Sequence, residues 1–240
     1  MDNWLSRTEL LLGDEKLAML KNSHVLVVGL GGVGAYAAEM ICRSGIGSMT
    51  IVDGDTVHTS NRNRQLPALQ STEGRAKAEV MGQRLLDINS RLRLTIINEY
   101  IKDERMIEII DKGYDYVVDA IDTLSPKVFL IYHTVNRKMP LVSSMGAGGK
   151  FDPLSVKISD ISDTNNCSLA RILRKKLHKL GVRNGFTAVW SPEEIDKEKV
   201  VPTNGEQNKA SVVGTISYMP AIFGIACASV VIRDLAGIAR

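Results

Sequence analysis

Cysteine is scarce in this sequence, and its scarcity excludes two classes of protein. The 240 residues include three cysteines, Cys42, Cys167 and Cys227, and no two of them form a C-x-x-C pair. No histidine lies at ligand spacing from them, so we expect neither a disulfide framework nor a cysteine-rich zinc site. Unpaired cysteines are typical of the reducing cytosol, and we therefore expect a cytoplasmic protein.

Long apolar runs are also rare. Met1–Leu12 lacks the basic start and apolar centre of a signal peptide. The longest apolar tract, Met219–Ile232, is closed by Arg233 after about 14 residues, whereas a membrane-spanning helix needs roughly 20. We therefore expect no integral membrane insertion. The tract is interpreted as a buried core helix, with peripheral contact at a membrane surface as the alternative.

No linker rich in proline, glycine or serine divides the chain. With 44% hydrophobic residues it can bury a large core, so we expect one domain over residues 1–240. The formal charge of +3 permits a polyanionic partner without requiring one.

The most informative stretch follows His24. Val25–Val28 is apolar without polar alternation, as in a strand buried on both faces of a parallel sheet. Gly29, Gly31 and Gly34 follow at the G-x-G-x-x-G spacing, and the chain then becomes helical. Such a turn lets a phosphate approach the backbone at a helix N-terminus. A glycine turn that serves only packing is the alternative.

A second apolar strand, Met49–Val52, ends in Asp53, about where a ribose-binding acid belongs. Together with the glycine turn, this acid predicts a nucleotide site, although NAD, FAD and ATP enzymes share the pattern. The polar segment after it ends in Asn61-Arg62-Asn63-Arg64-Gln65. Two arginines beside two amides are suited to clamp phosphates, and a solvated surface loop is the alternative.

Strands alternating with helices over residues 24–149 predict an α/β fold, a doubly wound, mostly parallel, Rossmann-like sheet. Short N-terminal helices are expected within Leu5–Leu20, and residues 150–240 form a C-terminal extension. Further expected strands are Leu92–Ile97, Tyr116–Asp119, Leu141–Ser144, Val156–Ile161 and Thr187–Ser191. Further expected helices are Ser71–Asn89, Glu104–Asp111, Lys127–Asn136 and Ser168–Leu180, and Pro192–Ala210 is expected to be a mobile polar stretch.

Three polar clusters follow predicted strands: Gly29–Gly34, Asp53–Gln65 and Asp119–Asp122. Because such sheets bind ligands beyond the carboxyl ends of their strands, the three clusters should converge on one crevice. Asp119 is expected either to support Asp122 or to cap the loop.

The glycine turn, Asp53, Asn61–Gln65, Lys77 and Asp122 occur in an order that resembles the ubiquitin-activating-type (ThiF/MoeB-like) adenylating enzymes. The resemblance implies ATP and Mg²⁺ as cofactors and activation of a carboxylate by adenylation. It places ATP against Gly29, Gly31, Gly32, Gly34, Asp53, Asp55, Asn61, Arg64, Gln65 and Lys77. It makes Arg64, Lys77, Asp122 and Arg7 the catalytic set, with Mg²⁺ at Asp122 and Arg7 reaching the neighbouring site of a homodimer.

Longer runs, such as Gly146–Pro153 and Gly214–Ala221, look like the branch of this family that dehydrates threonylcarbamoyladenosine in tRNA. That branch would cyclise the modified base through a carboxyl adenylate. Asn166-Cys167 departs from the Asp-Pro expected there. The alternative is an adenylyltransferase for a ubiquitin-like sulfur-carrier protein, against which the missing C-x-x-C pairs argue. A nicotinamide oxidoreductase would leave Arg64, Lys77 and Asp122 unexplained.

A basic helix is the candidate tRNA contact, with a solvated face as the alternative. Its cations are Arg171, Arg174, Lys175, Lys176 and Lys179. A sulfur-transfer or carrier protein is a second candidate partner. Cys167 is interpreted as structural rather than catalytic, because a nucleophile tethered within the substrate makes a covalent enzyme intermediate unnecessary. Cys42 and Cys227 are expected in the core.

Overall fold

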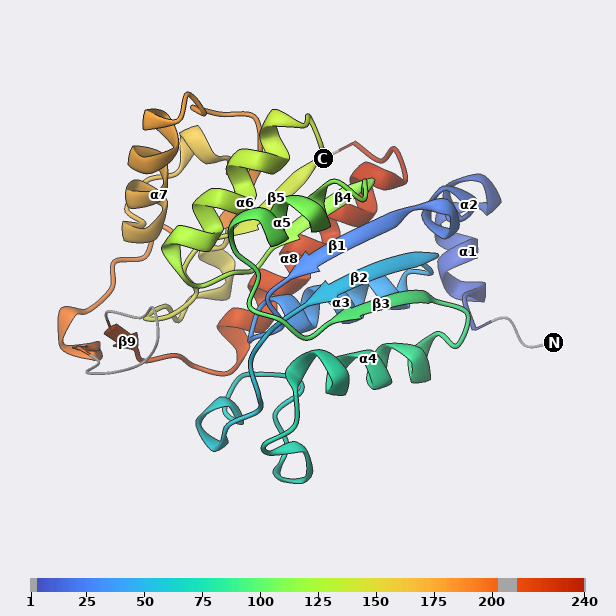
Figure 1. The fold of residues 1–240 in the computed structure, drawn as a ribbon, viewed down its shortest axis with the longest axis horizontal. Coiled ribbons are helices and arrows are strands. Elements are labelled where there is room, and N and C mark those ends of the chain that lie inside the picture. The colour runs from blue at the N-terminus through green and yellow to red at the C-terminus, as the bar shows by residue number, and fades with distance from the viewer. Residues whose placement is uncertain (1–3, 203–210, 240) are drawn as a thin grey trace.

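The computed structural model describes residues 4–202 and 211–239, and it has a seven-stranded sheet with helices on both faces (Figure 1). The strand order is β3-β2-β1-β4-β5-β7-β6. Neighbouring strands are parallel except for the antiparallel edge pair β6–β7. The bounds are β1 His24–Val28, β2 Ser48–Val52, β3 Arg93–Ile97, β4 Tyr116–Asp119, β5 Leu141–Ser144, β6 Lys157–Asp160 and β7 Thr187–Trp190. The expected doubly wound α/β fold is confirmed, and its strand order reverses between β1 and β4.

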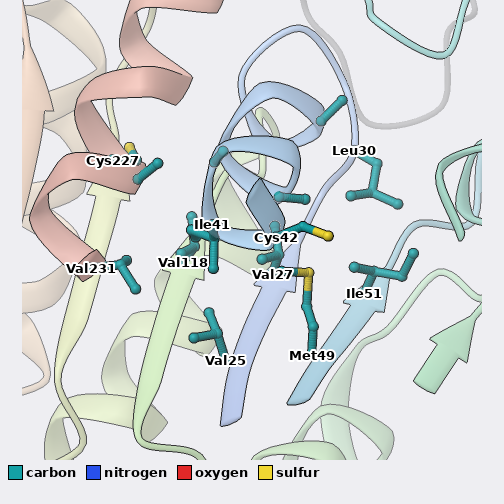
Figure 2. Close-up of a cluster of buried hydrophobic side chains, with 14 of the residues drawn as sticks. Val25, Val27, Leu30, Ile41, Cys42, Met49, Ile51, Val118, Cys227 and Val231 are labelled. Carbon is teal, nitrogen blue, oxygen red and sulfur yellow. The ribbon is translucent and has the colours of Figure 1, made fainter. Parts of the chain in front are cut away.

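Helices cover the two faces of the sheet separately. One face carries α3 (Gly34–Arg43), α4 (Lys77–Ile88) and α8 (Tyr218–Leu235), and the other carries α5 (Asp103–Ile110), α6 (Leu124–Asn136) and α7 (Ser168–Lys179). Within β1, Val25 and Val27 face the first core while Leu26 and Val28 face the second, which explains why the strand shows no polar alternation. Figure 2 shows Val25 and Val27 on the face that packs against α3.

The two short N-terminal helices are present as α1 (Ser6–Leu12) and α2 (Asp14–Asn22). They lie at the amino-terminal ends of the strands, on the right in Figure 1. A Cβ on Gly45, three residues before β2, would come within 2.8 Å of Leu5 Cδ1. The glycine therefore lets α1 pack closely at this end of the sheet.

Two expected helix boundaries were wrong. The helix expected from Ser71 begins at Lys77, because Gly74 has a φ of +80° and the preceding chain forms a 3₁₀ turn, Gln70–Thr72. The helix expected from Lys127 begins at Leu124, since Pro126 in its first turn is tolerated. The C-terminal helix extends beyond the apolar tract, to Leu235.

Helix α8 has 18 residues and is long and apolar enough to cross a membrane by length and composition alone. Its buried side chains include Met219, Phe223, Cys227 and Val231, and it packs on α3 and the sheet. Figure 2 shows Cys227 and Val231 turned toward the sheet. These contacts confirm the interpretation as a core helix.

Beyond β7 the chain forms a ribbon that we did not expect. Val200–Pro202 (β8) pairs antiparallel with Ser211–Val213 (β9). The expected mobility of Pro192–Ala210 falls partly on residues 203–210, which lie outside the described residues.

Candidate functional site

The glycine turn passes tightly between β1 and α3. Gly29 has a φ of +89°, and a Cβ there would approach Ala120 O to 2.7 Å. A Cβ on Gly34 would lie 1.8 Å from Gly29 O, so the helix could not begin so close to the strand. The turn therefore brings the N-terminus of α3, with its partial positive charge, to the edge where β1 and β4 end.

Asp53, which directly follows β2, links the end of that strand to the glycine turn through hydrogen bonds. Its Oδ2 accepts a hydrogen bond from Leu30 N at 2.6 Å, and its Oδ1 accepts one from Asp55 N at 2.8 Å. Burial raises the pKa of Asp53, and the positive charge of Lys77 opposes that rise. Each carboxylate oxygen retains a second acceptor position, which suits ribose hydroxyl groups.

Asp55 and Lys77 form an ion pair at the rim of the crevice. Lys77 Nζ lies 2.9 Å from Asp55 Oδ2, and the Lys77 side chain is 5% exposed while that of Asp55 is 40% exposed. The Tyr100 hydroxyl donates to Asp55 Oδ1. Burial, the bond to Asp55 and the nearby charges of Asp53 and Asp122 raise the pKa of Tyr100. Sequence reasoning missed Tyr100, whose hydroxyl is bound to Asp55 and feels the charges of Asp53 and Asp122.

The Asn61–Gln65 segment is ordered by its own side chains. Buried Asn61 Oδ1 accepts from His58 N at 3.1 Å, and Arg64 Nη1 donates to Ser60 O at 2.9 Å and to Asn63 Oδ1 at 2.7 Å. The segment is therefore a built loop rather than a freely solvated one.

Gln65 shows that the site fits a polar ligand. Its Oε1 is buried and has no hydrogen-bond partner among the described residues. Its amide nitrogen would lie 3.7 Å from a Cβ on Gly31, so the side chain lines the glycine turn. A buried acceptor without a donor is costly, and a ligand carrying hydroxyl or N–H groups would satisfy it.

Beneath the crevice, Asp119 and Lys127 form a fully buried ion pair. Their side chains are both 0% exposed, with Lys127 Nζ 2.7 Å from Asp119 Oδ2. Ser143 Oγ donates to Asp119 Oδ2 at 2.6 Å, and Lys127 Nζ also donates to Ile121 O at 3.1 Å. Asp119 Oδ1 accepts from Ile121 N, so Asp119 caps the loop that carries Asp122.

Asp122 itself is exposed, and its charge is among those that act on Tyr100. The described residues contain no group of three or more His, Cys, Asp or Glu side chains that could hold a metal. A cation at Asp122 would therefore need other oxygen ligands, such as the phosphates of a bound nucleotide.

Arg7 is the member of the predicted catalytic set that lies on α1, away from the glycine turn. It is exposed on α1, at the amino-terminal ends of the strands, whereas the glycine turn lies at their carboxyl ends (Figure 1). Within one chain, Arg7 therefore does not join the crevice.

The C-terminal extension contacts the glycine turn and the Asn61–Gln65 segment. Asn63 Nδ2 donates to Thr215 O at 3.0 Å, and Gly149 N donates to Gly214 O at 2.8 Å. A Cβ on Gly32 would lie 2.9 Å from Pro220 Cβ. These contacts, which link residues far apart in the chain, could not be predicted from local spacing.

The predicted basic helix is α7, and its cations differ in exposure. Arg171, Lys175, Lys176 and Lys179 are exposed, whereas Arg174 is partly buried and donates to Thr164 O at 2.6 Å. Arg174 thus has a structural contact that the sequence did not indicate.

All three cysteines are buried and unpaired. Cys42 and Cys227 lie in the core, where burial raises the pKa of each thiol to about 12. Cys167, at the start of α7, is 6% exposed and belongs to the core cluster beneath that helix.

Comparison with known proteins agrees with this geometry. The ThiF family profile matches residues 5–240. The tRNA threonylcarbamoyladenosine dehydratase of Bacillus subtilis is 38% identical over 96% of this chain and 93% of its own length. The Escherichia coli enzyme of that name, solved in complex with ATP, superposes with a TM-score of 0.89 at 34% identity, over 99% of this chain and 96% of that one.

A sulfur-carrier enzyme is similar over a shorter stretch. Molybdopterin-synthase adenylyltransferase of Salmonella typhimurium is 36% identical over 52% of this chain. The family resemblance drawn from the glycine turn, Asp53, Lys77 and Asp122 is thus confirmed: the chain belongs to the ThiF family.

Proposed function

We propose that this protein uses ATP to dehydrate threonylcarbamoyladenosine in tRNA, closing a ring through a carboxyl adenylate. The observation that carries the proposal is that Asp53 links the glycine turn to Asp55 of the Asp55–Lys77 pair, with the orphaned Gln65 side chain beside the same turn. Similarity to dehydratases along nearly their whole length supports this acceptor over a carrier protein.

The chemistry follows from what a carboxylate needs before a weak nucleophile can displace its oxygen. The substrate carboxylate attacks the α-phosphate of ATP and diphosphate leaves, while Lys77 and Arg64 neutralise the charge that builds on the phosphates. A carbamoyl nitrogen or oxygen of the same substrate then attacks the acyl adenylate and expels AMP. Because that nucleophile is tethered, its effective concentration is high and no enzyme thiol is required.

Asp122 is the proposed ligand for Mg²⁺, which would supply further positive charge to the phosphates. Its exposure leaves room for such an ion between the carboxylate and a bound nucleotide. In Asp122→Asn, the rate of adenylation should depend less on the Mg²⁺ concentration than it does in the wild type. If the two proteins show the same dependence, Asp122 is not the Mg²⁺ ligand.

A homodimer is the proposed assembly, with Arg7 acting in the neighbouring site. Leu10 and Leu11 beside it on α1 are 88% and 83% exposed, an apolar surface that a second copy would cover. In mixed dimers of Arg7→Ala and Asp122→Asn subunits, one site would carry both changes and the other neither, so activity should recover. Activity at background after proven subunit exchange would contradict the assignment.

The C-terminal extension is proposed to act together with the nucleotide-binding core. Residues 1–240 are proposed to act as one adenylating domain in the cytoplasm, with α7 contributing tRNA phosphate contacts through Arg171, Lys175, Lys176 and Lys179. Strand β7 of the extension pairs with β5, which supports a single unit. A carrier or sulfur-transfer protein remains the second candidate partner.

Diphosphate release from ATP tests the proposal. It should be stimulated by tRNA carrying threonylcarbamoyladenosine, but neither by unmodified tRNA nor by a small carrier protein. Arg64→Ala should abolish release while the fold is kept, because this loop side chain is outside the core. Stimulation by the carrier protein alone, or near-normal release by Arg64→Ala, would overturn the assignment.

A further inference from the structure

A second hollow lies outside the crevice, between α6 and α7. It is a groove of about 250 Å³. Its lining residues are Ser125, Val128, Phe129, Tyr132 and His133 of α6, Lys176 of α7, and Leu180. The reaction described above uses none of these seven side chains.

Three rings give the groove an aromatic wall. The ring centroids of Phe129 and His133 are 4.3 Å apart, and those of Tyr132 and His133 are 5.1 Å apart in an edge-on arrangement. All three side chains are partly exposed. Burial and the adjacent Arg137 lower the pKa of His133, so its ring is neutral at pH 7 and can present a stacking face.

The two helices that form the groove carry positive charges and no acidic residue. Neither residues 124–136 nor residues 168–179 include an aspartate or glutamate. Lys176 lines the groove, and Lys175 and Lys179 are exposed beside it on α7. Asp111, near the far end of α6, is paired with Arg137 at 2.5 Å. A polyanion is therefore the partner that this surface complements.

One end of the groove lies near Asp122 in the chain. Helix α6 starts two residues after Asp122, and Ser125 of its first turn lines the groove. A strand whose reacting nucleotide enters the crevice at Asp122 could therefore continue along α6.

We propose that the groove receives an unpaired base of the RNA substrate, stacked on Tyr132 and Phe129, with Lys176 on the adjoining phosphate. The inference rests on the proposed tRNA function. Single-stranded loops are recognised by bases stacked on aromatic rings beside cations that follow the backbone, and both features are present here. An aliphatic side chain of a partner protein would use the apolar wall but would not require aromatic rings.

The test compares an aromatic with an aliphatic side chain at one position. The probe is a stem-loop RNA with threonylcarbamoyladenosine in its loop, and its dissociation constant is measured directly. Tyr132→Leu should weaken binding about tenfold, whereas Tyr132→Phe should bind like the wild type. Lys176→Glu should weaken binding and lower its salt dependence, and Arg91→Glu, on an exposed residue in the α4–β3 connection, serves as the charge-matched control.

Loop RNAs with single abasic sites identify the stacked base. One abasic position should weaken binding to the wild type but have little further effect on Tyr132→Leu. The inference would be overturned if Tyr132→Leu and the wild type bound the intact RNA with equal affinity. It would also be overturned if Tyr132→Leu lost the same affinity for every abasic RNA, because no single base would then account for the loss. Wild-type protein that binds this RNA without releasing diphosphate would instead overturn the proposed function. ATP affinity and circular dichroism verify that each variant is folded, and Lys176→Glu tests the groove without altering its rings.

Discussion

Two lysine–aspartate pairs flank β1, and they differ in what surrounds them. Lys77 and Asp55 follow β2 at the rim of the crevice, with a 2.9 Å contact and an aspartate that is 40% exposed. Lys127 and Asp119 meet at 2.7 Å beneath the end of β4, where neither side chain is exposed at all. The chemistry is the same, but only the first pair can be reached by a ligand.

The difference assigns the two lysines different tasks. Burying an ion pair costs desolvation, so a sealed pair is explained better by what it positions than by its net stability. Lys127 donates a hydrogen bond to Ile121 O and thereby positions the loop that carries Asp122. Lys77 can turn toward an incoming phosphate, because Asp55 would keep its bond from Tyr100 and its contact with solvent.

The largest expected effect is a loss of catalytic activity when Lys77 is replaced. Lys77→Met should lower diphosphate release by about 10³-fold or more, since a cation on the transferring phosphates is lost. The free energy of unfolding should fall by only about 1 kcal/mol, because Asp55 can be hydrated. Urea titration and a diphosphate assay measure both, with the exposed Lys112→Met as the matched control. A folded variant with nearly wild-type release would contradict the role of Lys77.

The second effect is on stability. Lys127→Met should lower the free energy of unfolding by about 3–5 kcal/mol, because the Asp119 carboxylate would stay buried without its partner. Arg137→Met, which breaks the partly exposed pair with Asp111, should cost only about 0–1 kcal/mol. Removing both charges with Lys127→Met and Asp119→Leu should recover part of the loss. Equal losses of unfolding free energy in Lys127→Met and Arg137→Met would contradict the distinction between a buried and a partly exposed ion pair.

These pairs also show how much of the site the sequence could predict. Gly29, Gly34, Asp53 and Lys77 were identifiable because a motif fixes their local spacing. Tyr100 was missed because its partner Asp55 lies 45 residues away.

Other contacts depended on the fold in the same way. The bond from Asn63 to Thr215 spans 152 residues. The ribbon β8–β9 was missed because its strands have only three residues each. Buried strands and apolar helix faces are periodic and predictable, whereas side-chain contacts across the crevice exist only once the sheet has formed.

A third buried lysine sharpens the comparison, because none of the carboxylates in the described part of the chain is directly bound to it. Lys150 is 2% exposed, and its Nζ donates to the carbonyl oxygens of Ser191 and Glu193 at 3.1 and 2.7 Å. Burial lowers its pKa, and the nearby Glu193 carboxylate opposes that shift. Between that lowered value and about 10.4, the unfolded chain binds the proton more tightly, so this lysine makes stability rise with pH.

Lys150→Met should remove this contribution, which is at most about 1.4 kcal/mol per pH unit for one proton. Unfolding free energies measured from pH 7 to 10 give the slope for each protein. The raised pKa of Tyr100 acts in the opposite sense near the upper limit, so the informative quantity is the difference between wild type and variant. If the unfolding free energies of the wild type and the variant change with pH in parallel, Lys150 keeps its charge in the folded protein at little cost in stability.

The smallest expected effect concerns Cys167, which lies in the core cluster beneath α7. It is 6% exposed at the start of α7, so packing explains it without chemistry. Because the carbamoyl nucleophile is tethered to the activated carboxylate, Cys167→Ser should keep the rate of ring closure within about twofold of wild type. Product formation and acyl adenylate are followed together by quenched-flow mass analysis, with Cys42→Ser as the buried-thiol control. A Cys167→Ser enzyme that accumulates acyl adenylate without closing the ring, while Cys42→Ser closes it normally, would make Cys167 the acyl acceptor and place a covalent step on a side chain that the geometry assigns to packing.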